Sequence, residues 1–451
     1  MRDILKIAVS ALAALALAGC SLSVTHDWED FSASKKIDFD VKGLDPATCF
    51  IPFDAEQSVM DGDAILSCGM PDGRTVGEVV DEEDTKTTST NGTALFKGVI
   101  SSWHSGKIES YAGSYWSVDV NGEPIRLSGR IVVPTDHKVS RVMVVSHFTI
   151  GADVEAPSNE VPLEAVFAAR GIAVIEPDYI GYGITRHLIH PYLCSEITSR
   201  NVVDMYDAAL NFLPAIGCKP KNDDIFVYGF SQGGAVALGV AQYLEERRPD
   251  VKIRLLMCGS GPYDICATYD KLIENDLTDY PCAIPMIIQG LDNGYHLDLD
   301  YSKFFQPGMQ EKMFGSGPYC SPQSEAWLNS KNYTMAEITS LIGSKKVSAV
   351  MSKEAMNKAT DNMTELYRAM VDNSVSNGYV VHSCPVYFFH SMDDNVVPYE
   401  NFQTVDEKFY KEEANYTCNV GHYGNHVASC LRFLYSSMTL LYSNKDIDRV
   451  L

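Results

Sequence analysis

The spacing of hydrophobic residues changes repeatedly along the chain from about residue 115 onward. Short runs rich in Val and Ile alternate with longer segments whose apolar residues recur every three or four positions. This alternation predicts the α/β class, with a mostly parallel central sheet flanked by helices. The strand-like runs cover 141–146, 171–176, 224–228, 253–258 and 386–389, and the helical segments cover 195–213, 235–247 and 427–441.

Two stretches before these runs differ from them. Asn121-Gly122 separates the strand-like residues 117–120 from the strand-like residues 125–134. Because both turn residues tolerate positive φ, we expect a β-hairpin here. Residues 20–98 instead mix acidic and Ser/Thr-rich segments with no sustained period, and we interpret them as a tether and N-terminal extension.

The first twenty residues have the features of an export signal. Arg2 and Lys6 provide a positive start, and an apolar run ends in small residues just before Cys20. This order resembles a bacterial lipoprotein signal. We therefore expect removal of residues 1–19, acylation of Cys20, and attachment by lipid to the bacterial outer membrane or cell surface. The alternative is an ordinary secretory signal that ends near a cysteine, and both interpretations predict export.

Charge and cysteine content exclude several other classes. The 451 residues carry 36 Lys and Arg against 59 Asp and Glu, a formal net charge of −23. Because nucleic-acid binding depends on clustered positive charge, nucleic acid is not an expected partner. Twelve cysteines are present, but no Cys-x-x-Cys pair points to a zinc site, and no metal is predicted. The sequence leaves disulfide connectivity and oligomeric state open.

A G-x-S-x-G motif at residues 229–233 is the strongest chemical signal in the chain. It follows the strand-like run 224–228 and precedes the helical segment 235–247. This is the context of a nucleophile elbow, in which a serine occupies a sharp turn between a strand and a helix. Only residues without side chains leave room two positions before and after such a serine. Ser231 is therefore the candidate nucleophile.

A serine nucleophile needs a base and a carboxylate that orients the base. The candidate carboxylate is Asp394, in the turn after the strand-like run 386–389. We prefer it to the neighbouring Asp393 because of its spacing from His390 and the Val-Val-Pro sequence that follows it.

Two histidines are candidates for the base. His426 stands at the head of the helical segment 427–441, after a short loop, and His422 lies four residues earlier. We favour His426 because a base just after a short loop, at the start of a helix, is the usual arrangement, and we keep His422 as the alternative. The chain order Ser, Asp, His is that of α/β-hydrolases and differs from the serine-protease orders.

Further motifs add to this match with α/β-hydrolases. Over residues 115–440 the chain resembles an α/β-hydrolase of the secretory lipase family, in its lipase A-like branch. One departure is that Phe148 stands where the family has glycine, so the N–H of either Phe148 or Thr149 faces the oxyanion. The motifs lie at residues 145–151, 156–158, 176–183 and 190–193.

This resemblance implies a serine esterase or lipase that acts on acyl esters through an acyl-enzyme intermediate. Ser231 attacks the ester carbonyl, His426 moves the proton to the leaving alcohol, and Asp394 orients His426. The backbone N–H groups of Gln232 and Thr149 then stabilise the tetrahedral oxyanion. The mechanism requires no metal and no organic cofactor.

A long segment separates the last two strand-like runs, where a minimal hydrolase needs only one helix. Residues 335–341 and 353–371 within it have helical periodicity. We interpret residues 265–383 as a helical cap, or lid, over the active site, and residues 99–264 and 384–451 as the two parts of the hydrolase core. Large apolar residues of the cap either line an acyl site or form the cap's own core: Tyr301, Phe304, Phe305 and Met313.

Three functions are compatible with these residues. The first is hydrolysis of carboxylic esters, with acyl esters as substrates. The second is peptidase activity of an aminopeptidase or dipeptidyl-peptidase type, through the same three side chains. The third is a lipid-anchored binding protein without catalysis. The presence of all three triad residues argues against this third function. The sequence does not specify the acyl chain length, nor does it separate esterase from lipase.

Overall fold

The computed structural model contains one large sheet in the part of the chain that it describes. The predicted export signal, Cys20 and most of the predicted tether lie outside that part. No helix within it is long and apolar enough to cross a membrane. The described residues are 49–53, 58–60, 70, 74, 78, 107–315 and 325–442.

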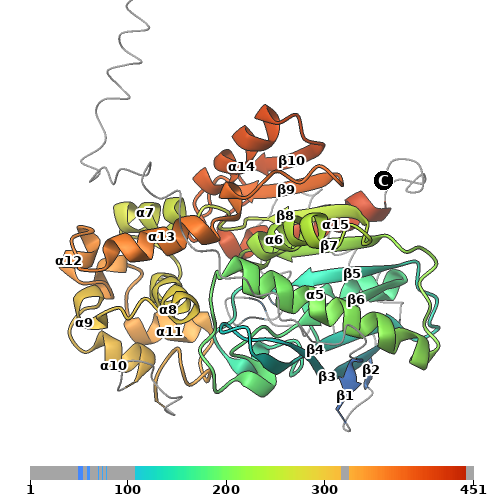
Figure 1. Cartoon of the computed structure of the whole chain (residues 1–451). Coiled ribbons are helices and arrows are strands. Elements are labelled where there is room, and N and C mark those ends of the chain that lie inside the picture. The colour runs from blue at the N-terminus through green and yellow to red at the C-terminus, as the bar shows by residue number, and fades with distance from the viewer. Residues whose placement is uncertain are drawn as a thin grey trace, which may run out of the picture.

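The sheet joins a parallel part to a smaller antiparallel part (Figure 1). The strand order is β1-β3-β4-β6-β5-β7-β8-β9-β10, with β2 paired to β3. Strand pairs from β6 to β10 are parallel, and the pairs among β1 to β4 and between β4 and β6 are antiparallel. The strands are β1 Ile51–Pro52, β2 Ser58–Met60, β3 Ile108–Val118, β4 Pro124–Pro134, β5 Arg141–Ser146, β6 Ile172–Pro177, β7 Ile225–Phe230, β8 Ile253–Gly259, β9 Val386–Ser391 and β10 Tyr416–Gly421.

Helices cover both faces of the sheet, as expected for parallel strands whose side chains are buried on both sides. Helices α5 (Ser195–Phe212) and α6 (Gln232–Arg247) pack against each other, and α6 lies on the face to which Gly229 of β7 points. Helix α14 (Glu400–Lys411) packs on β9. Helix α15 (His426–Tyr442) lies on the opposite face.

The chain has an insertion between β8 and β9, whose described residues form seven α-helices that gather on one side of the sheet (Figure 1). Apolar side chains of the insertion belong to the same continuous hydrophobic core as those of the sheet. The helices are α7 Ile265–Asn275, α8 Ala283–Tyr295, α9 Tyr301–Phe304, α10 Met309–Phe314, α11 Met335–Ile342, α12 Lys353–Met356 and α13 Met363–Asn373.

Most predicted elements occur, with two differences. Residues 353–371 form two helices, α12 and α13, because two residues between them adopt left-handed backbone conformations: Lys358 (φ 55°) shortly after α12 and Asn362 (φ 64°) directly before α13. Strand β10 and helix α14 were not predicted. Strand β10 is half exposed and carries no apolar run, so only its parallel pairing with β9 identifies it as a strand. The predicted hairpin joins β3 and β4, whose pairing ends at Val118 and Pro124.

The large apolar residues of the insertion pack against one another. The Tyr301 ring packs against Phe305 and Phe314 at centroid distances of 5.6 and 5.2 Å, and Phe305 and Phe314 lie 5.3 Å apart. Phe304 and Met313 are fully buried. The two interpretations of this cluster left open by the sequence are therefore resolved in favour of internal packing.

An aromatic cluster around Phe433 fastens α15 to the sheet. The Phe433 ring is fully buried and stacks on Tyr228 of β7 at 4.8 Å and on Tyr387 of β9 at 6.4 Å. It also contacts Phe230 at 5.9 Å and Phe389 at 5.6 Å. Because α15 begins at His426, this cluster sets where the first turn of the helix lies over the ends of the strands.

We expect Phe433→Ala to lower the free energy of unfolding by about 3–5 kcal/mol, since it removes a buried ring and leaves a cavity. Phe433→Leu should cost about 1.5 kcal/mol or less because it keeps most of the volume. Urea unfolding followed by fluorescence measures both values. Equal stability of the alanine variant and the wild type would contradict this role for the cluster.

Candidate active site

Ser231 occupies a sharp turn between β7, which ends at Phe230, and α6, which begins at Gln232. Its backbone has φ 57° and ψ −125°, a conformation that side-chain-bearing residues rarely adopt. A Cβ at Gly229 would overlap the backbone of Gly233, and a Cβ at Gly233 would overlap the Ser146 carbonyl at the end of β5. The two glycines of the motif are thus required by the close approach of backbones at this turn.

The structure brings Ser231, His426 and Asp394 into one hydrogen-bonded chain. His426 Nδ1 lies 2.6 Å from Asp394 Oδ2, and His426 Nε2 lies 2.8 Å from Ser231 Oγ. An ionised carboxylate can only accept, so Nδ1 carries the hydrogen and Nε2 accepts the Ser231 hydroxyl hydrogen. Ser231, His426 and Asp394 are each less than a tenth exposed.

The environment of Asp394 favours its ionised form. Burial by itself raises the pKa of this carboxyl, but this effect is opposed by attraction to the His426 ring when that ring is protonated and by the hydrogen bond from the ring. The backbone N–H groups of Val396 and Val397 each donate to Asp394 Oδ1 at 2.9 Å. The net pKa of Asp394 therefore lies below its ordinary value.

The alternative residues, Asp393 and His422, form a separate pair on the surface. His422 Nδ1 lies 2.7 Å from Asp393 Oδ1, and the two side chains are 73% and 42% exposed. Asp393 Oδ2 also accepts from the Gly424 N–H at 3.3 Å. The pair has no contact with Ser231, and it ties the loop before His426 to the turn after β9.

Ser391, the last residue of β9, holds the same loop from inside. Its buried hydroxyl donates to the Gly424 carbonyl at 2.7 Å and accepts from the Tyr423 N–H at 3.2 Å. Sequence reasoning missed this residue, because a serine at the end of a strand carries no signal of its own.

Two buried histidines brace the start of α6 and the loop after β5. His190 Nδ1 lies 2.8 Å from the Ile180 carbonyl, so it donates there, and Nε2 accepts from the Gln232 side-chain amide at 2.8 Å. Burial lowers the pKa of His190 to about 3, which keeps the ring neutral. The Tyr179 ring stacks on His147 at 4.0 Å and on His190 at 5.9 Å.

The Glu155 carboxyl closes the loop after β5. It accepts from the N–H groups of Gly151 at 3.1 Å and Ala152 at 2.9 Å. Burial raises the pKa of Glu155 to about 7, although these two hydrogen bonds act in the opposite direction. The loop that carries Phe148 and Thr149 is therefore fixed by a carboxyl group that is easily protonated.

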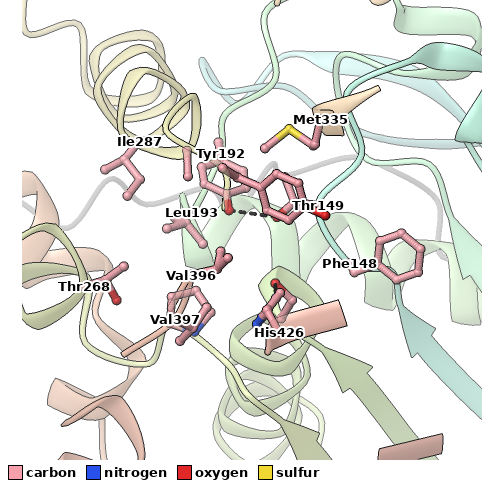
Figure 2. Close-up of a pocket in the computed structure, with 14 residues that line it drawn as sticks. Phe148, Thr149, Tyr192, Leu193, Thr268, Ile287, Met335, Val396, Val397 and His426 are labelled. Atoms are coloured by element: carbon pink, nitrogen blue, oxygen red, sulfur yellow. Dashed lines mark hydrogen bonds between the residues drawn. The ribbon is translucent and has the colours of Figure 1, made fainter. Parts of the chain in front are cut away.

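A small cavity lies beside Ser231 and His426 (Figure 2). Phe148 and Thr149 line it, as do residues of the insertion: Thr268, Tyr280, Ala283, Ile287 and Met335. Its volume of about 30 Å³ is enough for about two water molecules.

Two further observations concern metal-binding groups and cysteines. No group of three or more His, Cys, Asp or Glu side chains that could hold a metal ion occurs in the described part of the chain. The nine cysteines that lie within the described ranges are all free thiols.

Comparison with known families decides the classification. The secretory lipase family model matches residues 160–441, more than half of the chain. The chain belongs to the secretory lipase family. It is therefore a hydrolase of the lipase and esterase class, and the family description indicates secretion. A search of curated proteins finds no match for this secretory lipase.

Solved structures show that this secretory lipase has the α/β-hydrolase fold. A ligand-bound form of the rice cell wall degrading esterase LipA from Xanthomonas oryzae matches with a TM-score of 0.62 and 16% identity, over 88% of this chain and 96% of that chain. Candida antarctica lipase A matches with a TM-score of 0.50 and 16% identity, over 71% of this chain and 73% of that chain. At sequence identities this low, the structural similarity shows a shared fold and nothing further.

We expect the stability of this secretory lipase to fall as pH rises from about 4.5 to about 7 through the Glu155 carboxyl. A carboxyl with a raised pKa in the folded state keeps its proton longer than in the unfolded state, so its contribution is present at low pH and lost as pH rises through the folded pKa. Between about pH 4.5 and pH 8, the wild type should lose about 1–3 kcal/mol more unfolding free energy than Glu155→Gln.

Urea unfolding of both proteins across this pH range measures the difference. The other acidic groups titrate equally in the two proteins, so the difference between wild type and Glu155→Gln isolates the contribution of Glu155. Parallel stability curves would contradict the expectation.

Proposed function

We propose that this chain is an exported serine hydrolase that cleaves carboxylic esters of acyl groups, with Ser231, His426 and Asp394 as its catalytic triad. The observation that carries the proposal is the chain of hydrogen bonds of 2.8 and 2.6 Å from Ser231 through His426 to Asp394. The strained backbone of Ser231 supports it, because sparsely populated conformations of this kind cluster at active sites.

The proposed reaction follows from these positions. Ser231 Oγ attacks the ester carbonyl while His426 Nε2 takes its proton, and the imidazolium that forms is stabilised by Asp394. Nε2 then gives the proton to the leaving alcohol, which leaves an acyl group on Ser231. Water, activated by His426, attacks this acyl-enzyme and releases the acid.

Two backbone N–H groups are the proposed donors to the tetrahedral oxyanion. Gln232 is the first residue of α6, and an N–H at this position has no acceptor within its helix. Thr149 lines the same cavity as Ser231. Each donor of this kind contributes on the order of 3 kcal/mol to the transition state.

The composition of the cavity favours esters over the peptidase alternative. None of the fourteen described residues that line it is Asp or Glu. An aminopeptidase or dipeptidyl-peptidase binds the ammonium group of a peptide N-terminus, which requires a carboxylate close to the nucleophile. The walls are instead largely apolar, as an acyl group requires. In this proposal the insertion at residues 265–383 acts as the cap that forms one wall.

The proposed location is the bacterial outer membrane or cell surface, where the chain is attached through acylation of Cys20. The proposal rests on the positive start, the apolar run and the small residues before this cysteine. The acidic chain, with a net charge of −23, gains no attraction from an anionic membrane, so attachment is left to the lipid.

We expect Ser231→Ala to abolish the cleavage of chromogenic acyl esters and the covalent labelling by a fluorophosphonate, because both need the serine oxygen. Esters from acetyl to long-chain acyl, beside aminoacyl and dipeptidyl amides of the same leaving group, test substrate class and chain length in the wild type. The surface variant His422→Gln serves as the matched control and should keep most of the activity.

Labelling of Ser231→Ala at the rate of the wild type would refute Ser231 as nucleophile. Loss of activity in His422→Gln with retention in His426→Gln would move the role of base to His422. Preference for the amides over the esters would replace the ester proposal with the peptidase alternative.

We expect Cys20→Ala, expressed in a bacterium with its full leader, to move the protein from the membrane pellet to the soluble fraction. The variant has no thiol to acylate, so it lacks the lipid on which attachment depends. Fractionation with metabolic labelling by a fatty-acid analogue measures both effects. A variant that stays in the pellet and still incorporates the label would contradict acylation at this position.

A further inference from the structure

A pair of hydroxyl groups faces the cavity at the nucleophile and has no place in the mechanism so far. Thr149 Oγ1 lies 2.8 Å from Tyr192 OH, and Thr149 and Tyr192 both line the cavity that Ser231 and His426 line. Figure 2 shows this hydrogen bond across the cavity from His426, with Met335 of the insertion above it. Thr149 is also the residue whose backbone N–H is proposed as an oxyanion donor, so its side chain lies beside that N–H.

Counting hydrogens shows what the pair can do. Each hydroxyl has one hydrogen and can both donate and accept. The single bond between Thr149 and Tyr192 uses one of the two hydrogens, and within the described ranges neither hydroxyl has another recorded partner. One O–H hydrogen of the pair is therefore left to point into the cavity.

The chemistry of the two groups assigns that hydrogen to Thr149. A phenol is more acidic than an aliphatic alcohol, so Tyr192 is the better donor and the Thr149 oxygen the better acceptor. Burial raises the pKa of Tyr192 to about 12, so the phenol keeps its hydrogen at working pH. Donation by Tyr192 also polarises the Thr149 O–H bond and strengthens it as a donor.

The position of Tyr192 is fixed from the other side by the insertion. A Cβ at Gly290 of α8 would overlap the backbone of Tyr192, so the helix and this segment are in direct contact. The Tyr192 side chain is 6% exposed, and its ring packs against His190 at 5.8 Å. The phenol that holds the Thr149 hydroxyl is therefore preorganised, which is what stabilisation of a developing charge requires.

We propose that the Thr149 hydroxyl, oriented by Tyr192, donates a side-chain hydrogen bond to the tetrahedral oxyanion in addition to the two backbone donors. This inference rests on the proposed function, in which Ser231 generates that oxyanion. Tyr192 acts as a positioning residue because it works through Thr149. The insertion then contributes to catalysis by holding Tyr192 in place.

The test compares Thr149→Val, which keeps the shape and loses the hydroxyl, with Thr149→Ser, which keeps the hydroxyl. We expect kcat for a short acyl ester to fall about 10- to 100-fold in the valine variant, with KM changed less than about threefold. The serine variant should stay within about threefold of the wild type. Thr149→Ala is the second variant without a hydroxyl, should the valine variant fail to fold.

An inhibitor that forms a tetrahedral adduct separates this role from a structural one. A boronic acid adds to the Ser231 oxygen and places an oxygen where the oxyanion forms, so its inhibition constant should rise with the loss of kcat. The affinity of a ground-state product, the carboxylic acid, should not change. A structural defect would weaken the binding of both the boronic acid and the product acid, or would change only the thermal stability.

A further variant, Tyr192→Phe, decides which hydroxyl delivers the hydrogen. We expect a reduction of kcat of about two- to tenfold, smaller than that of Thr149→Val, because Thr149 keeps its hydroxyl. A larger loss in Tyr192→Phe than in Thr149→Val would overturn the assignment to Thr149. A Thr149→Val variant with wild-type kcat would overturn this inference, and the proposed function would still stand if Ser231→Ala is inactive. An active Ser231→Ala variant would instead refute the proposed function itself.

Discussion

The close approach of three backbones at Ser231 is the constraint on which the rest of the site depends. Helix α6 begins directly at the end of β7, so its first turn lies against the end of β5, and only glycine fits at positions 229 and 233. The Ser231 N–H donates to the Gly259 carbonyl at the end of β8 at 2.8 Å. The strained serine, at a cost on the order of 1–3 kcal/mol, is thus held by three neighbouring strands that the buried sheet keeps rigid.

The other functional groups reach Ser231 because parallel strands end at one edge of the sheet. Thr149 follows β5, Ser231 follows β7, Asp394 follows β9 and His426 follows β10. Residues far apart in the chain therefore meet at the carboxyl edge, where loops are free to carry chemistry. The insertion between β8 and β9 closes this edge with largely apolar side chains, and through Gly290 it also fixes Tyr192.

The parts that could be predicted were those with a strong local signal. The runs of β5 and β8 and the helical spacing of α5 and α15 locate most of the core, and the glycines around Ser231 mark its turn. The edge strand β10 escaped prediction because its residues are half exposed and its register comes from β9. Ser391 also escaped, and the motif at residues 190–193 gave no role for Tyr192, since the importance of both residues lies in hydrogen bonds to distant loops.

What the sequence by itself determined was the α/β class, the strained turn at Ser231 and a short set of candidate acids and bases, because these follow from hydrophobic period and from the steric needs of glycine. The sequence favoured Asp394 and His426, but only the tertiary structure showed where each of the two Asp–His pairs lies. Asp394 and His426 are buried beside Ser231, whereas Asp393 and His422 pair at the surface, although the two aspartates are neighbours in the chain and the two histidines are only four residues apart. That difference arises from the way α15 packs on the sheet through Phe433, and such packing is a property of contacts between distant segments.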